Sequence, residues 1–161
     1  MSRTQAFAEL SQYALEVLRR DEEFILYRGE NRDQSGSSSV LLLAPVSTQP
    51  SPETLRKLEY EFSLRNDLDS IWAIRPQAMS EQSGRAMLVL EDPGGETLDH
   101  FLQEPMELTE FLRLAIGLAT ALAGLHGRDL IHKDVKPANV LINAATGQVR
   151  LMGFGIASRL P

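Results

Sequence analysis

The densest group of chemically capable side chains in this sequence lies in one short run. Asp134 is followed by Lys136 and, five positions after the aspartate, by Asn139, with Pro137 between them. A carboxylate can accept a proton from a hydroxyl group, and an amide oxygen can hold a hard metal ion. A long apolar segment precedes the run and the apolar residues Val140–Ile142 follow it, which predicts a loop between a helix and a strand.

This run closely resembles the catalytic loop of Ser/Thr protein kinases, which reads H-R-D-x-K-x-x-N before a short apolar strand. The resemblance implies that Asp134 faces the substrate hydroxyl, that Lys136 steadies the transferred phosphoryl group and that Asn139 is a catalytic residue and a metal ligand. Lys133 replaces the usual arginine, which keeps the charge but loses the planar fork. The alternative interpretation, a charged turn between a helix and a strand, is disfavoured because six positions match in order.

Two further segments match the same family in the same order. The run from Met87 to Leu98 resembles the fifth strand, the hinge and the next helix of a kinase, which implies that Glu91, Asp92 and the hinge backbone face an adenine ring. By itself this run also fits an edge strand that ends in a turn. Glu61 falls where the family has its helix-C glutamate, and the alternative is an ordinary surface pair with Lys57 or Arg65.

Three phosphate-handling features of the family are missing. The first lysine of the chain is Lys57, so no lysine can lie on the third strand, and Arg28 or Arg32 would have to replace it. Gly29 and Gly36 are too far apart to form the G-x-G-x-x-G phosphate cradle. Gly153 stands where D-F-G has its magnesium-binding aspartate. ATP and Mg²⁺ are therefore possible cofactors, but their binding should be weakened.

The hydrophobic pattern predicts the elements that position these residues. Together with the resemblance, these elements imply an α+β, protein-kinase-like fold, with an antiparallel-sheet N-terminal lobe and the first helices and catalytic loop of a C-terminal lobe that stops, incomplete, at Pro161. The predicted domains are an amphipathic helix in 1–22, the N-lobe in 23–91, the hinge in 92–96 and the partial C-lobe in 97–161. The predicted strands are 24–28, 40–43, 71–78 and 86–91, and the predicted helices are 3–20, 52–66, 97–103 and 109–127, the last of them buried.

Composition narrows the class of protein. The 161 residues carry a net charge of -6 with no basic patch, which argues against nucleic-acid binding. Cysteine is absent, so disulfides and thiolate chemistry are excluded. The longest apolar run, Leu114–Leu125, is shorter than the roughly 20 residues that cross a bilayer. A cytoplasmic protein without membrane insertion is expected.

The order of the elements also resembles the N-terminal kinase-like segment of large bacterial multidomain sensor kinases. That resemblance implies a signalling role, with protein partners or further domains in a larger chain. Two functions remain open. One is a pseudokinase, acting as a regulatory or nucleotide-sensing unit. The alternative is a Ser/Thr protein kinase with residual phosphotransfer through its intact catalytic loop.

Overall fold

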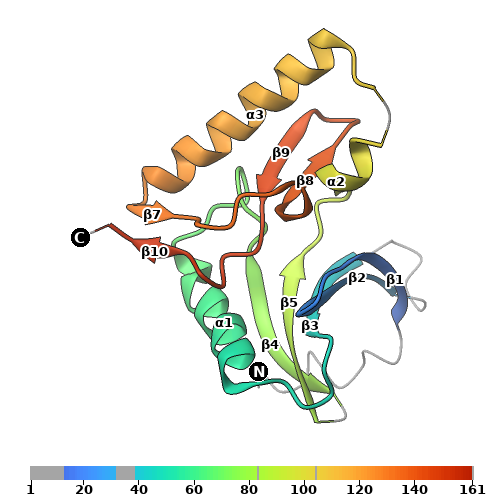
Figure 1. Cartoon of the computed structure of the whole chain (residues 1–161), viewed down its shortest axis with the longest axis vertical. Helices are drawn as coiled ribbons and strands as arrows, with labels where there is room; N and C mark the ends of the chain where they lie inside the picture. The colour runs from blue at the N-terminus through green and yellow to red at the C-terminus, as the bar shows by residue number, and fades with distance from the viewer. Residues whose placement is uncertain (1–12, 32–38, 83, 104, 161) are drawn as a thin grey trace.

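The computed structural model describes residues 13–31, 39–82, 84–103 and 105–160. The first half of the chain forms a five-stranded antiparallel sheet with one helix across it, and the second half forms two small sheets beneath a long helix (Figure 1). The α+β class and the antiparallel first lobe are thus as predicted from the sequence.

The large sheet has the strand order β1-β2-β3-β5-β4. Antiparallel neighbours meet with Leu26 opposite Leu43 and Leu41 opposite Leu90. The predicted hairpin of the second and third strands and the predicted strand before the hinge are confirmed. The predicted strand at 71–78 begins only at Pro76, because the segment before it turns to dock on strand β9 (Gln148–Leu151). The strands are β1 (Tyr13–Arg20), β2 (Phe24–Asn31), β3 (Ser39–Pro45), β4 (Pro76–Gln82) and β5 (Arg85–Glu91).

The predicted helix over residues 3–20 is wrong from Tyr13 onward, where the chain forms β1, and residues 3–12 lie outside the described part. β1 pairs with β2 along its whole length, with Val17 opposite Tyr27. Apolar residues at helical spacing determine the secondary structure of a segment only weakly when an open strand edge is available. Pairing with that edge satisfies every second backbone group of the incoming segment. A register shift between Val17 and Arg19 then turns Leu18 towards the inner face of the sheet.

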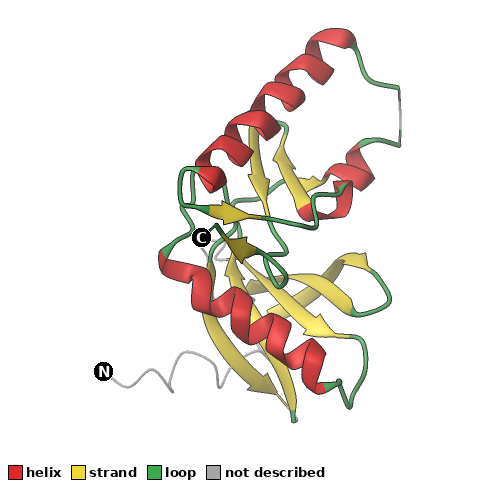
Figure 2. Ribbon diagram, turned by 60° about the vertical axis from the view of Figure 1, so that its left-hand side comes forward, coloured by secondary structure: helices red, strands yellow, loops and turns green. Residues whose placement is uncertain are grey.

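Helix α1 (Pro52–Ser63) forms where the sequence predicts it, and the one-turn 3-10 helix Leu64–Asn66 continues it. Ser51 is the N-cap, since its side chain accepts a hydrogen bond from the Thr54 amide at 3.1 Å, and Pro52 occupies the first helical position. Figure 2 shows α1 lying across the strands of the large sheet. Leu58 joins this helix to the inner apolar cluster of the sheet. This cluster consists of Leu26, Leu41, Leu43, Leu58, Ile74, Leu88, Leu90, Leu141 and Met152.

Replacing Ser51 with Ala should lower the free energy of unfolding by about 1 kcal/mol, because the Thr54 amide loses its capping acceptor. Chemical denaturation monitored by far-UV circular dichroism measures the change. Ser63→Ala is the control, because that hydroxyl at the other end of α1 only donates back to the Tyr60 carbonyl. If the two variants lose equal stability, the cap does not have the role assigned to it.

The alternation of β3 separates two apolar faces. Leu41 and Leu43 point to the inner cluster with Leu58, whereas Leu42 and Ala44 belong to a cluster on the opposite face. Successive side chains of a strand point to opposite faces, so this division fixes which residues of β3 can reach the cleft between the two halves.

The second half of the chain begins directly after the hinge. β6 pairs with β8, and β8 pairs with β9, while β7 pairs with β10. The amide of Ile74 donates to the Leu151 carbonyl at 2.8 Å, which ties the segment before β4 to β9. The elements are β6 (Glu96–Thr97), α2 (Leu98–Phe101), α3 (Leu108–His126), β7 (Leu130–Ile131), the 3-10 helix Pro137–Asn139, β8 (Val140–Asn143), β9 (Gln148–Leu151) and β10 (Ser158–Arg159).

Helix α3 differs from the prediction in its burial. It spans the predicted residues, but within it only Ala121 and Leu125 are buried, whereas an apolar stripe is exposed. Glycines bring its packed face close to its neighbours, since a Cβ at Gly124 would lie 2.5 Å from Trp72. The exposed stripe consists of Leu108, Phe111, Leu112 and Ile116.

By length and composition alone, α3 could also cross a membrane. The helix has 19 residues, and the 12-residue apolar run noted in the sequence lies within it. Helices of soluble domains often pass the same test, so the feature is weak evidence.

Candidate active site

The loop that carries the predicted catalytic residues is anchored by a buried histidine. His132 is 1% exposed, and its Nε2 lies 2.9 Å from the Met152 carbonyl, while its ring packs on Phe154 at 4.8 Å between centroids. The Asp134 amide donates to His132 Nδ1 at 3.2 Å. Burial lowers the pKa of His132, so the neutral ring is favoured as the acceptor for this amide.

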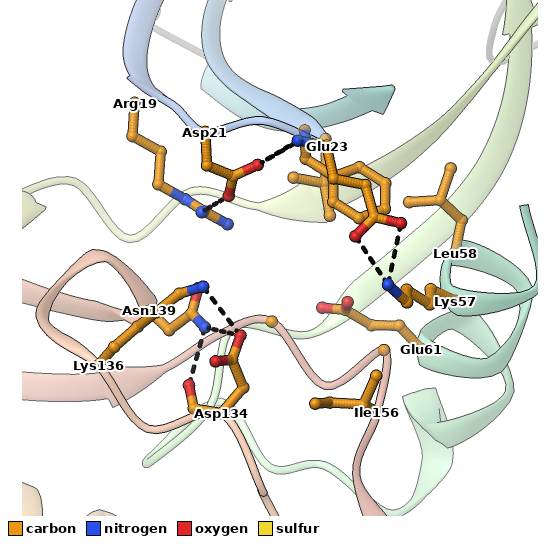
Figure 3. Close-up of a pocket in the computed structure, with 14 residues that line it drawn as sticks. Arg19, Asp21, Glu23, Lys57, Leu58, Glu61, Asp134, Lys136, Asn139 and Ile156 are labelled. Atoms are coloured by element: carbon orange, nitrogen blue, oxygen red, sulfur yellow. Dashed lines mark hydrogen bonds and ion pairs between the residues drawn. The ribbon is translucent and has the colours of Figure 1, made fainter. Parts of the chain in front are cut away.

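Asp134, Lys136 and Asn139 lie together in this loop. Asn139 Nδ2 donates to both the Asp134 carbonyl and its Oδ2, each at 2.9 Å, and Lys136 Nζ lies 3.1 Å from the same Oδ2 (Figure 3). The 3-10 turn that begins at Pro137 brings Asn139 back over Asp134. The run that the sequence predicts to be one loop thus holds Asp134 and Asn139 in direct contact.

These residues line a pocket of about 150 Å³ between the two halves of the chain. Pockets that bury a drug-sized ligand have volumes of roughly 300–1,000 Å³, so this one is small. The upper wall comes from β1, β2, β3 and α1, and the lower wall from the catalytic loop and the segment after β9 (Figure 3). Its lining comprises Arg19, Asp21, Glu23, Phe24, Leu43, Lys57, Leu58, Glu61, Asp134, Lys136, Asn139, Gly153, Gly155 and Ile156.

The turn that covers this pocket is acidic and is not the one expected from the glycines. It joins β1 to β2 and contains Asp21 and Glu23, and Asp21 Oδ1 accepts the amides of Glu23 and Phe24 at 2.9 and 2.7 Å. Gly29 instead lies within β2 beneath Tyr13, and Gly36 is outside the described residues. The missing phosphate cradle is therefore replaced by a tight turn of carboxylates.

Each cation that lines the pocket is paired with a carboxylate. Besides Lys136 with Asp134, Arg19 Nη1 lies 2.8 Å from Asp21 Oδ2, and Lys57 Nζ lies 2.7 Å from Glu23 Oε2. The hydrogen bond from Lys57 to Glu23 raises the pKa of this lysine. Burial opposes ionisation of Asp21, but its two amide donors and Arg19 outweigh that effect and lower its pKa.

Arg28, one of the two cations proposed from the sequence, does not line the pocket. Arg28 points to the hinge, where it pairs with Asp92, and Arg32 lies outside the described residues. Arg19 and Lys57 are the cations that the sequence interpretation missed. Lys57 could have been found, because it stands one helical turn before Glu61 on α1 and so shares its face.

Glu61 is buried without a lysine partner. Leu43 is the residue of β3 that lines the same pocket as Glu61, whereas Ala44 lies on the opposite face of the sheet. Glu61 is 2% exposed, and its Oε1 has no hydrogen-bond partner among the described residues. Burial raises the pKa of Glu61 to about 7, although the amides of residues 153–155 and the charge of Arg19 oppose the shift.

The surface-pair interpretation of Glu61 is therefore wrong. Lys57 pairs with Glu23, and Arg65 donates to the Phe62 carbonyl and lies over the ring of that residue.

The two hinge residues named from the sequence lie apart from this pocket. The Glu91 carboxylate accepts hydrogen bonds from the Ser70 hydroxyl at 2.7 Å and from the Arg75 amide at 3.0 Å. The Asp92 side chain is fully buried against Arg28. The structure thus brings Glu61 together with the catalytic loop, but not Glu91 or Asp92.

The residues present do not fit a magnesium ion. Gly153 supplies no ligand, and an added Cβ there would lie 2.8 Å from Asn139 Oδ1, so the asparagine amide occupies the space beside the missing aspartate. Among the described residues no group of three or more His, Cys, Asp or Glu side chains is placed to hold a metal. Asn139 Oδ1 has no hydrogen-bond partner within the described part of the chain, and one amide oxygen is not a site for a cation that requires near-octahedral coordination.

A five-stranded antiparallel sheet with one helix, joined through a hinge to a lobe that carries this loop, is the architecture of a protein kinase. The family model described as "Protein kinase domain" matches residues 43–161, and the chain belongs to that family.

Similar proteins carry kinase names. The chain is 28% identical over 127 residues to a mitogen-activated protein kinase kinase of Aspergillus fumigatus, with coverage of 74% of this chain and 25% of that protein. It is 30% identical over 161 residues to serine/threonine-protein kinase dkf-2 of Caenorhabditis briggsae, with coverage of 95% and 13%. It is 26% identical over 145 residues to mitogen-activated protein kinase kinase 7 of Arabidopsis thaliana, with coverage of 89% and 46%. The chain thus spans less than half the length of each of these relatives.

Proposed function

We propose that this chain is a pseudokinase module of a signalling protein, with the shape of a Ser/Thr kinase lobe pair but without efficient phosphotransfer. The observation that carries the proposal is the pairing of the cations in the pocket where the phosphates of ATP would have to bind. Arg19, Lys57 and Lys136 each hold a carboxylate of this chain, so none is free to hold the phosphates of ATP. The phosphates would also meet the carboxylates of the covering turn.

The loss of catalysis follows from the way in which phosphoryl transfer is accelerated. The protein must position the phosphates and stabilise the charge that develops on them, which it does with cations and with metal ions. Gly153 stands in place of the family's metal-binding aspartate, and Leu43 stands in place of its strand lysine. Removing a single preorganised donor typically slows a reaction by about 10²–10³-fold, so two losses leave little rate.

The alternative function, a Ser/Thr protein kinase with residual activity, is supported by Asp134, Lys136 and Asn139 and by the names of the relatives. It is weaker, because Gly153 supplies no metal ligand and no unpaired cation among the described residues replaces the strand lysine. In our proposal the module is cytoplasmic and acts through protein partners or further domains of a larger chain, as in bacterial multidomain sensor kinases.

A phosphotransfer assay tests the proposal. The purified protein is incubated with radiolabelled ATP, Mg²⁺ and a generic Ser/Thr substrate protein, beside an Asp134→Asn variant as the matched control. We expect the two proteins to give the same background incorporation, because the unmodified protein already lacks the metal and phosphate ligands. Incorporation by the unmodified protein that disappears in Asp134→Asn would establish the kinase function instead.

A further inference from the structure

A continuous apolar cluster joins the two halves of the chain beside the hinge. Leu26 of β2 and Leu41 of β3 come from the large sheet, and Leu141 of β8 and Met152 come from the second half. All four belong to one group of buried, contacting residues, and each is at most 2% exposed. The gap in which a planar ligand would have to lie between sheet and β8 is therefore filled by side chains.

The strand register places Leu41 at the centre of this contact. Leu41 lies opposite Leu90, one residue before the end of β5, and Val40 lies opposite Glu91. With Leu43 at the position of the missing lysine, the sequence V-A-I-K of active kinases aligns with residues 40–43, and Leu41 replaces its alanine. A leucine there adds a branched side chain where an alanine would leave space, and that side chain belongs to the same buried cluster as Leu141.

The outer mouth of the same gap is bridged by Arg28. Its Nε donates to Asp92 Oδ2 at 2.7 Å, and its Nη2 donates to Asp92 Oδ1 at 3.1 Å and to the Gly95 carbonyl at 2.8 Å. Arg28 stands on β2 and Asp92 follows β5, so the guanidinium spans from the sheet to the hinge.

We propose that Leu41 and Arg28 exclude nucleotide from this chain, with Leu41 filling the adenine position and Arg28 closing its mouth. This inference rests on the proposed pseudokinase function. A pseudokinase could act as a nucleotide sensor or as a regulatory unit that works without ATP, and the inference favours the second of these. The pocket of about 150 Å³ at the other end of the cleft is separate from the filled part and carries the ion pairs described above.

The test compares ligand binding by the unmodified protein and by Leu41→Ala. Thermal denaturation is recorded with 1 mM adenosine, with 1 mM MgATP and without ligand. The unmodified protein should show no shift with either ligand. Leu41→Ala should gain an adenosine-dependent rise in melting temperature of about 2–4 °C, because the truncation opens a cavity beside the hinge. MgATP should shift this variant less than adenosine does, since its phosphates meet the acidic turn.

Leu42→Ala is the matched control. Leu42 is the next residue of β3 and is equally buried, but it points to the opposite face of the sheet. It should lose stability without gaining adenosine binding. A folded Leu41→Ala protein that ignores adenosine would overturn the assignment of Leu41.

A melting-temperature shift of the unmodified protein with either ligand would overturn exclusion itself, whether or not the variant folds. If that protein binds MgATP but gives no Asp134-dependent phosphotransfer, the exclusion fails while the pseudokinase proposal stands. If it both binds and transfers, both fail.

Discussion

Gly153→Asp should destabilise the protein by about 3 kcal/mol instead of repairing its active site. Gly153 has a φ of +79°, a conformation that costs a residue with a side chain roughly 1–2 kcal/mol. The new Cβ would also lie 2.8 Å from Asn139 Oδ1 and displace the amide, which makes two hydrogen bonds to Asp134 worth about 1 kcal/mol each. The expected fall in melting temperature is roughly 6–12 °C.

Gly147→Asp separates the two causes of this loss. Gly147 has a similar φ of +71°, but nothing lies within 4 Å of its added Cβ. It should therefore show only the cost of the backbone conformation. Equal losses of stability in Gly153→Asp and Gly147→Asp, measured by chemical denaturation, would contradict the collision with Asn139.

The same variant bears on activity. Gly153→Asp should give no phosphotransfer above background, because the phosphates still lack a strand lysine and still meet the acidic turn, and groups that act together are strongly non-additive. The lysine of any combined repair belongs at Leu43, which lines the pocket, and not at Ala44, which faces away. Only combined repair is expected to help.

The unmodified protein should become less stable as the pH rises because Glu61 ionises, and Glu61→Gln should abolish this decrease. The folded-state pKa of Glu61 is about 7, above its ordinary value of 4.5, so the folded protein keeps a proton that the unfolded chain has released. Stability contributed by this group is therefore present below pH 4.5, falls between pH 4.5 and about 7, and stays low above it. The full difference is on the order of 3 kcal/mol.

Unfolding free energies measured at pH 5 and pH 8 check this expectation. Glu61→Gln should gain stability relative to the unmodified protein at pH 8 and should gain little at pH 5. Glu59→Gln, an exposed position on the same helix, is the control and should change neither value appreciably. A Glu61→Gln protein whose stability tracks the unmodified protein at both pH values would show that the carboxyl group is not held neutral.

The sequence allowed the loop and the order of most elements to be predicted, because short-range signals determine them. Ser51 and Pro52 mark the start of α1 by capping chemistry, and the turn through Pro137 brings Asn139 back to Asp134. β1 was missed because its identity depends on pairing with β2, and apolar spacing within one segment does not reveal an available strand edge.

The chemistry of the cleft was the harder part to predict. The pairs Arg19–Asp21 and Lys57–Glu23 could be recognised only once the turn after β1 was known to cover the pocket. From the sequence, the glycine-rich phosphate loop is missing because Gly29 and Gly36 are too far apart, and a helix is expected at 3–20 where β1 lies from Tyr13 onward. The turn after β1 was therefore not considered as the cover of the pocket, and Arg28, named as a substitute cation, binds the hinge.

Glu23 has a consequence for how such a module can transmit a signal. Its carboxylate accepts from Thr54 and Lys57, so the first turns of α1 are fastened to the turn between β1 and β2, while Lys57 also packs against Gly155 of the second half. A switch needs an element with two alternative positions of similar free energy. Contacts on both sides bias α1 towards one position, so under the proposed function we expect information to pass through this module by what is bound to its surface and not by displacement of α1.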